Sequence, residues 1–179
     1  VYKRQLLLRF LGSPDPYGTQ IDGLGGATSS TSKVALVSRS NRPGFDVDYR
    51  FGAAAVGEPV IDWSGNCGNL SAAVGVFALC RGLIVAPGDG IVAVRIWQAN
   101  LNEAIVAHIP MRDGQPVEGG DFKLAGVAFP GAEITLDFLD PGGETVLLPS
   151  GRPTDRLTVP GLGEIEATLL NAGNPTIFV

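Results

Sequence analysis

The residue of this chain with the clearest chemical potential is Cys67, which stands among glycines and asparagines in the run WSGNCGN, residues 63–69. An apolar stretch, residues 70–80, follows directly and is expected to form a helix. Backbone N–H groups at a helix start lack intrahelical acceptors and attract anions. They also stabilise a thiolate, the form of cysteine that accepts protons or attacks carbon. The run predicts a reactive thiol and, with equal weight, a small apolar filler, the usual role of a free cysteine.

A second candidate is Lys33, which follows a loop of small hydroxyl residues and precedes an apolar strand. Such a lysine can direct its ammonium at an anion or, when desolvated, serve as a base. A solvated lysine at a strand start is the commoner arrangement. Cys80 lies in the apolar helix and is interpreted as a buried filler. About 20 Å of helix separates the two cysteines, too far for a disulfide, so both thiols are expected to be reduced.

Other catalytic patterns are weak in this sequence. The glycine-rich residues 23–26 follow no strand and lack the Gly-Lys-Ser/Thr ending of a phosphate-binding loop, so no nucleotide site is predicted. His108 is the single histidine, which favours an ordinary strand histidine over a zinc ligand, and no metal is expected. A Ser-His-Asp arrangement cannot be identified either. The polar residues around Trp97 fit a polar pocket and an exposed strand edge equally well.

The composition is that of a folded, acidic protein. Its 179 residues are 45% hydrophobic and 17% charged, which supports a packed core and excludes a disordered chain. A net charge of -5 argues against nucleic acid or an anionic membrane as a partner. There is no apolar run of about 18 residues, and residues 1–11 carry basic side chains, so neither a membrane-spanning helix nor a signal peptide is predicted. A cytoplasmic setting is expected.

The elements that must position Cys67 and Lys33 are two helices and many strands. Helices are expected at residues 2–11 and 70–80, and the second, apolar on every side, should be buried all round and end at Gly82. The expected strands are residues 34–38, 47–56, 59–63, 91–97, 103–109, 122–129, 132–138, 144–148, 164–170 and 175–179. One buried helix among strands predicts an α+β fold, a mixed β-sheet curled around a central helix.

We expect residues 1–179 to form a single domain of a longer protein. The chain begins without Met inside its first helix, and it ends on an apolar run, residues 176–179, with no closing turn. Its Pro and Gly clusters are interpreted as turns rather than as a linker between domains. If the active site lies between two domains, this chain would then contain only one side of it.

Five segments follow one another along nearly the whole chain. They are QIDGLGGATSSTSK at 20–33, DVDY at 46–49, WSGNCGN at 63–69, VRIWQAN at 94–100 and NAGNPTIF at 171–178. Together they resemble the PrpF family, whose members are similar in fold to diaminopimelate epimerase. The resemblance implies two similar domains, each a sheet curled around a helix, with the active site between them. It also implies that this chain is the N-terminal half, without the family's first strand and its C-terminal domain.

The resemblance further implies an isomerase that needs no cofactor and moves a proton, and with it a double bond, in a small unsaturated di- or tricarboxylate. Lys33 and Cys67 are the implied acid–base residues, and the order in which they act stays open. Donors are required for the substrate carboxylates and for the enolate-like charge that develops. The residues expected to bind the substrate are Ser29, Ser30, Ser32, Gly65, Asn66, Gly68 and Asn69.

The segments ATSSTSK and WSGNCGN look more like the branch that isomerises 2-methylaconitate between its trans and cis forms in the methylcitrate route of propionate breakdown. The alternatives are a 4-oxalomesaconate tautomerase and a methylitaconate delta-isomerase. An epimerase of the diaminopimelate type would need a second cysteine facing Cys67. A non-catalytic, truncated domain that only binds tricarboxylates is a further alternative. The expected partner is the small tricarboxylate, and a homo-oligomer is left open.

Overall fold

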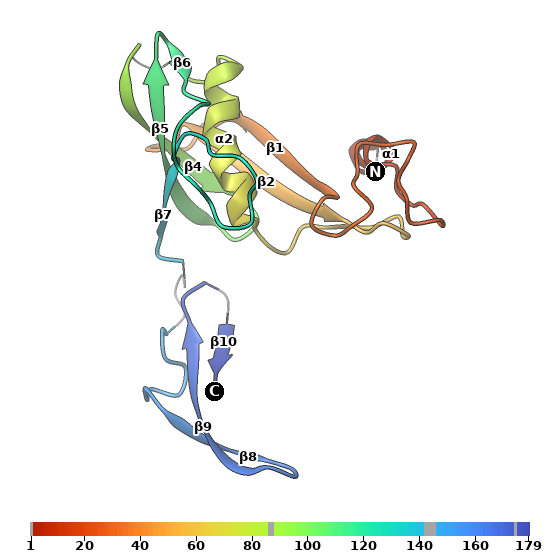
Figure 1. Ribbon diagram of the computed structural model, residues 1–179, viewed down its shortest axis with the longest axis vertical. Helices are drawn as coiled ribbons and strands as arrows, with labels where there is room; N and C mark the ends of the chain where they lie inside the picture. The colour runs from red at the N-terminus through yellow and green to blue at the C-terminus, as the bar shows by residue number, and fades with distance from the viewer. Residues whose placement is uncertain (1, 86–87, 142–145, 174) are drawn as a thin grey trace. The chain divides into compact units, whose positions relative to one another are not determined.

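A twisted mixed sheet with one helix lying along it is the main structure of the first part of the chain (Figure 1). The computed structural model describes residues 2–85, 88–141, 146–173 and 175–179, which fall into two units, Val1–Asp137 and Phe138–Val179. Within these ranges the elements, in chain order, are α1 Tyr2–Leu11, β1 Lys33–Arg39, β2 Val47–Ala54, β3 Ile61–Asp62, α2 Gly68–Cys80, β4 Gly90–Gln98, β5 Glu103–Arg112, β6 Gln115–Pro116, β7 Thr135–Leu139, β8 Asp155–Val159, β9 Gly163–Asn171 and β10 Pro175–Phe178.

The sheet of the first unit has the order β1-β2-β4-β5-β6, with β3 paired to β2 and β7 paired to β5. Strands β2 and β4 run parallel, whereas β1 with β2 and β4 with β5 are antiparallel, so the sheet is mixed as expected. In the second unit β9 pairs with both β8 and β10 in an antiparallel sheet. The α+β class predicted from the sequence is confirmed.

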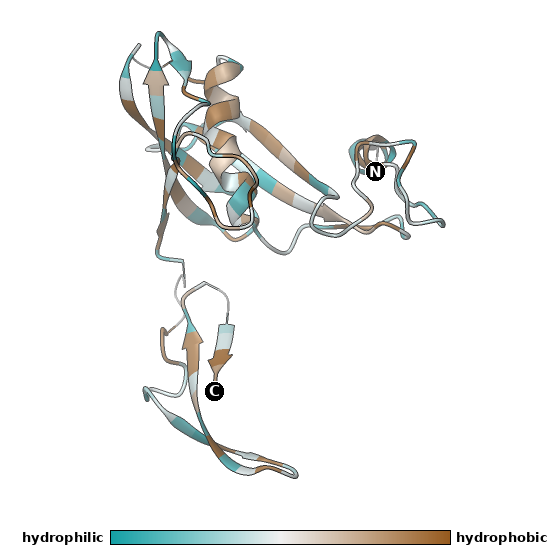
Figure 2. Cartoon of the chain, viewed as in Figure 1, coloured by the Kyte–Doolittle hydropathy of each residue, from teal (hydrophilic) through white to brown (hydrophobic). Residues whose placement is uncertain are grey.

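Helix α2 packs on the sheet through small side chains. Its buried Val74 and Ala78 join a core cluster with residues of β2, β4 and β5, and Figure 2 shows hydrophobic residues along α2 and β1. A Cβ on Gly75 would lie 2.5 Å from Cδ1 of Ile109, so the glycine permits the close approach of helix and strand. Gly82, at φ +63, ends the helix as predicted, because its N–H donates to the Leu79 carbonyl.

The expectation that α2 is buried on all sides is wrong. Ala73, Phe77 and Cys80, which succeed one another along one side of the helix, are exposed, and Phe77 keeps 45% of its surface. The interpretation of Cys80 as a buried filler is therefore also wrong, although both cysteines are free thiols. An open groove of about 710 Å³, lined mainly by apolar side chains, lies on this side of the helix. Apolar composition predicted burial on every side, but among the described residues none covers this side of the helix fully.

Most strand predictions are confirmed within one to three residues. The strand predicted at 122–129 is wrong, because these residues form only one bridge, between Phe122 and Gly131. The backbone turns at Gly126, which has φ +84. None of the described strands pairs with residues 122–129. Of the strand predicted at 144–148, the first two residues lie outside the described ranges. Residue 146 is irregular and residues 147–148 form a bend, so this part of the prediction is wrong. Strand β8 was missed, although its polar and apolar residues alternate.

The loop that joins α1 to β1 is organised by two polar side chains. Gln20, only 2% exposed, accepts hydrogen bonds through Oε1 from Ala27 N at 2.8 Å and from Ser32 Oγ at 2.7 Å. Its Nε2 donates to Ser13 Oγ at 2.8 Å. Asp15 accepts from the backbone N–H groups of Tyr17 and Gln20. These hydrogen bonds fix the conformation of the loop up to the start of β1.

This geometry gives a prediction for acid pH. Backbone hydrogen bonds from Tyr17 and Gln20 lower the pKa of Asp15 from 3.8 to about 2, so the carboxylate stabilises the fold above about pH 4 and loses that effect as the pH falls toward 2. Asp15→Asn should therefore lower the melting temperature at neutral pH, with a difference from wild type that shrinks toward about pH 2. Thermal melts of both proteins over this range test it. A difference that does not change with pH would contradict the role of the charge.

Candidate active site

The two residues proposed from the sequence as an acid–base pair lie together. Lys33 Nζ donates to Cys67 Sγ across 3.5 Å, although 34 positions separate them in the chain. Lys33 is the first residue of β1, and Cys67 is the N-cap of α2. Both side chains are half-buried, so each keeps part of its surface exposed to solvent. A proton can pass between such groups, or between either of them and a bound molecule.

Strand register explains the position of the Lys33 ammonium. Lys33 pairs with Ala53 across β1 and β2, and directly opposed residues share a face of the sheet. Phe51, two residues before Ala53, lies on that same face, and Lys33 Nζ is 6.0 Å from the centre of its ring. This face also carries the buried residues of β2 that pack in the core with α2. The ammonium is therefore directed toward the start of the helix rather than away from the sheet.

The start of α2 is fixed by Asn66 and Ser71. Asn66 Oδ1 accepts from the Cys67 N–H at 2.7 Å, and the fully buried Ser71 donates to the Cys67 carbonyl at 3.0 Å. No side chain caps the first turn, and Gly68 and Asn69 are exposed. Their N–H groups have no acceptor within the helix and are available to an anion. The thiol thus lies beside backbone donors, as the sequence predicts.

Asn100 ties the loop before Cys67 to the sheet. Its Nδ2 donates to the carbonyls of Phe51 at 2.8 Å and Trp63 at 2.5 Å, while its Oδ1 accepts from Phe51 N at 2.8 Å and from Gln98 Nε2 at 2.7 Å. Gln98 is fully buried. The alternatives for the VRIWQAN segment, a polar pocket or an exposed edge, are thereby replaced by a half-buried hydrogen-bond network of Gln98 and Asn100. Asn100 is one of the polar residues around Trp97 that the sequence singled out, but its partners depend on strand register, which the sequence does not display. Ser71, inside the apolar run, was missed.

The remaining predicted site residues differ in their surroundings. Ser29 and Ser30 are exposed, and Ser30 Oγ lies 2.9 Å from Thr28 Oγ1. Ser32 is fully buried, and its hydroxyl donates to Gln20 inside the loop. Gly65 is half-buried, in the loop that leads to Cys67. Substrate binding by these residues stays a prediction.

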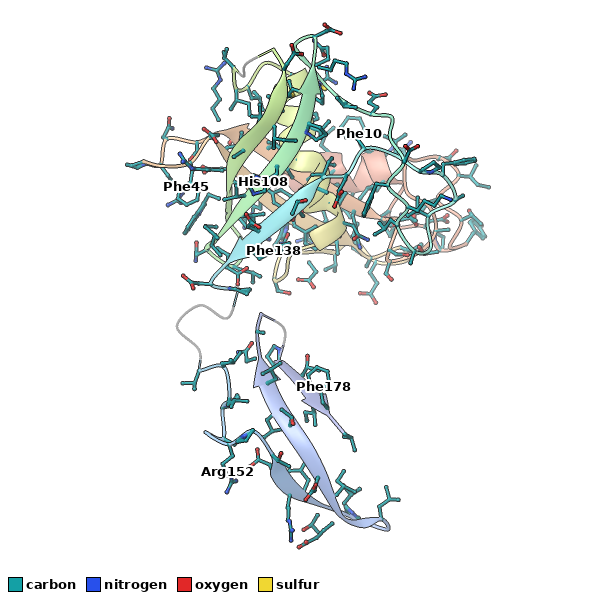
Figure 3. The ribbon with its side chains drawn as sticks, turned by 60° about the vertical axis from the view of Figure 1, so that its left-hand side comes forward. Phe10, Phe45, His108, Phe138, Arg152 and Phe178 are labelled. Atoms are coloured by element: carbon teal, nitrogen blue, oxygen red, sulfur yellow. The ribbon has the colours of Figure 1, made fainter. Side chains whose placement is uncertain are left out.

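His108 lies away from this pair, on β5, where Nε2 is 2.6 Å from Asp137 Oδ2 of β7 (Figure 3). Within the described ranges, no three His, Cys, Asp or Glu side chains come together as metal ligands. Neither of the two described helices is long and apolar enough to cross a membrane.

Comparison with known proteins gives relatives over the whole chain. It is 54% identical to a 2-methyl-aconitate isomerase of Cupriavidus necator, covering 97% of this chain and 46% of that protein. It is 53% identical to a protein of the same name from Shewanella oneidensis, with the same coverage. Identity to a 4-oxalomesaconate tautomerase of Pseudomonas putida is 41%, over 98% of this chain and 47% of the relative. The chain spans about half the length of the curated relatives that it matches.

A solved structure supports the same relationship. The crystal structure of a methylitaconate-delta-isomerase superposes with a TM-score of 0.85 at 36% identity, covering 98% of this chain and 45% of the other. The family model described as "PrpF protein" matches residues 2–179. Together with the Lys33 and Cys67 contexts that carried the resemblance, these matches establish that the chain belongs to the PrpF family.

Proposed function

We propose that this chain is the N-terminal half of a two-domain isomerase that moves a proton and a double bond in a small unsaturated tricarboxylate. The observation that carries the proposal is the 3.5 Å contact between Lys33 Nζ and Cys67 Sγ at the start of α2. This contact supports the proposal because two groups able to exchange protons then lie beside backbone N–H groups suited to an anion. The names of the relatives, all isomerases or tautomerases among those compared, support the same reaction class.

The proposed reaction needs one base and one acid. The base takes a proton from the carbon next to a carboxylate, and the electrons of that C–H bond form a new double bond to the neighbouring carbon. The electrons of the old double bond move to its far carbon. The acid then returns a proton to the far carbon, so the reaction is balanced without an oxidant or a reductant. N–H groups of Gly68 and Asn69 are suited to hold the negative charge that develops between the two steps. The order in which Lys33 and Cys67 act is open.

The substrate that we propose is 2-methylaconitate. Identity to the two 2-methyl-aconitate isomerases is 53–54%, compared with 41% to the oxalomesaconate tautomerase and 37% to a 3-methylitaconate isomerase of Eubacterium barkeri. Independence from cofactors, a cytoplasmic location and a place in propionate breakdown stay predictions from the sequence.

A panel of three acids tests this proposal. The whole protein is incubated with 2-methylaconitate, 4-oxalomesaconate and methylitaconate in turn, and each reaction is followed by proton NMR. We expect the highest kcat/KM for 2-methylaconitate. A higher kcat/KM for either of the other acids would transfer the proposal to that substrate, and no turnover of any of the three would reject it.

A further inference from the structure

Gly52 is a buried residue of β2 whose missing side chain leaves room for three neighbours. A Cβ at this position would lie 2.8 Å from Cγ2 of Ile61, 2.8 Å from Cζ3 of Trp63 and 2.9 Å from Cγ2 of Val34. Carbon atoms of packed side chains do not approach one another so closely, so any other residue here would push these neighbours away. Glycine therefore permits a packing that no other residue allows.

Two of these neighbours adjoin the segments that carry the proposed catalytic pair. Val34 follows Lys33 in β1 and pairs directly with Gly52. Trp63 begins the loop that joins β3 to α2 and ends at Cys67. The side chains of Val34 and Trp63 meet on the face of β2 opposite to that of Lys33. Gly52 thus lies where the strand that carries the lysine and the loop that carries the cysteine pack against each other.

A side chain at position 52 would displace the loop rather than the strand. Strand β1 pairs with β2 over all seven of its residues, whereas β3 pairs with β2 through two. The β-branched side chains of Val34 and Ile61 are stiff and the indole ring is rigid, so none of them gives way easily. Trp63 is also held by the Arg50 guanidinium, 5.1 Å from the ring centre, and through its carbonyl by Asn100. A displaced ring would therefore move the loop backbone and, with it, Cys67.

We infer that Gly52 is a positioning residue that acts through the contact between Lys33 and Cys67: by leaving room for the Trp63 ring, it keeps the sulfur 3.5 Å from the ammonium. The inference rests on the proposed function of this pair. Gly52 has no side chain with which to bind a substrate or exchange a proton. Its effect on the site is therefore purely geometric, and the effect should disappear when the Lys33 ammonium is absent.

A double-mutant cycle in the whole protein tests this inference. Wild type, Gly52→Ala, Lys33→Ala and the double variant are compared by the rate at which iodoacetamide alkylates Cys67 at neutral pH, with the Cys80 peptide as the reference in mass spectrometry. An ammonium beside the sulfur favours the reactive thiolate. Each single substitution should therefore slow the reaction about tenfold, the size of one hydrogen bond to a charged group. The double variant should react about as slowly as Lys33→Ala.

Met111→Ala is the control for a general loss of stability. Met111 is buried and pairs with Gly90 at the start of β4, at the opposite end of the sheet from Lys33. The cavity should lower the melting temperature, but Cys67 should react at the wild-type rate. If Gly52→Ala does not fold, Trp63→Phe takes its place in the cycle with the same expected rates, since the smaller ring leaves a gap at Gly52 and no longer fixes the loop.

A wild-type rate in Gly52→Ala or in Lys33→Ala would overturn the inference. Effects that multiply in the double variant would also overturn it, because Gly52 would then act independently of Lys33, and so would equal slowing in Met111→Ala. Because the readout needs no substrate, it separates the two proposals. A coupled cycle without turnover of 2-methylaconitate rejects only the proposed function, whereas turnover with multiplied effects rejects only the role of Gly52.

Discussion

Lys33→Ala in the whole protein is expected to lower kcat for 2-methylaconitate by about 10³-fold, within the range that one general acid or base contributes. The variant leaves Cys67 and the start of α2 intact but removes the only group seen to donate to the sulfur among the described residues. The reaction then lacks either its base or its acid, whichever of the two roles Lys33 has. The measurement is steady-state kinetics of isomerisation by NMR or ultraviolet absorbance.

Lys123→Ala is the matched control for this experiment. Lys123 is exposed and lies in the irregular segment before β7, so the same change of residue type there should leave kcat within about twofold of wild type, as for most surface substitutions. If Lys33→Ala retained comparable activity, Lys33 would have no part in the chemistry.

The second large effect is expected on folding, from Asn100→Ala. Four hydrogen bonds are lost, and the Phe51 and Trp63 carbonyls lose a donor in a half-buried setting. We expect the free energy of unfolding to fall by about 3 kcal/mol, the upper part of the range for leaving such groups unpaired. Urea denaturation of the variant and wild type measures this difference.

Asn41→Ala is a suitable control for Asn100→Ala, because Asn41 is exposed in the turn between β1 and β2. It should change the free energy of unfolding by no more than about 0.5 kcal/mol. An equal, small effect of both substitutions would mean that the Asn100 network does not hold the loop before Cys67 in place.

The fold was predictable where local pattern and tertiary structure agree. Helix α1 has the predicted bounds, and α2 begins two residues before the predicted start and ends where predicted, because apolar composition and Gly82 specify a helix and its end. The burial of α2 was not predictable in the same way. Apolar residues show that a surface tends to be covered, but Phe77 is exposed because coverage depends on other parts of the chain.

The two residues of the proposed pair could be named from the sequence, whereas the contacts that bring them together could not. Cys67 could be identified from the glycines and the helix start around it, and Lys33 from the hydroxyl loop and the family pattern. That they lie 3.5 Å apart depends on the register of β1 with β2, which no local pattern specifies. The partners of Asn100 likewise depend on how the strands pair, which no local pattern specifies.

The most direct test of the central claim, that Lys33 and Cys67 exchange the protons of the isomerisation, is the turnover of 2-methylaconitate by Cys67→Ser in the whole protein. Serine keeps the size and hydrogen bonding of the side chain, but it removes the acidity of the thiol. With the reaction run in D₂O and followed by NMR, we predict wild-type product that carries deuterium, and product formation in the variant reduced by about 10³-fold. Deuterated product formed by Cys67→Ser at the wild-type rate would contradict the proposed role of the pair.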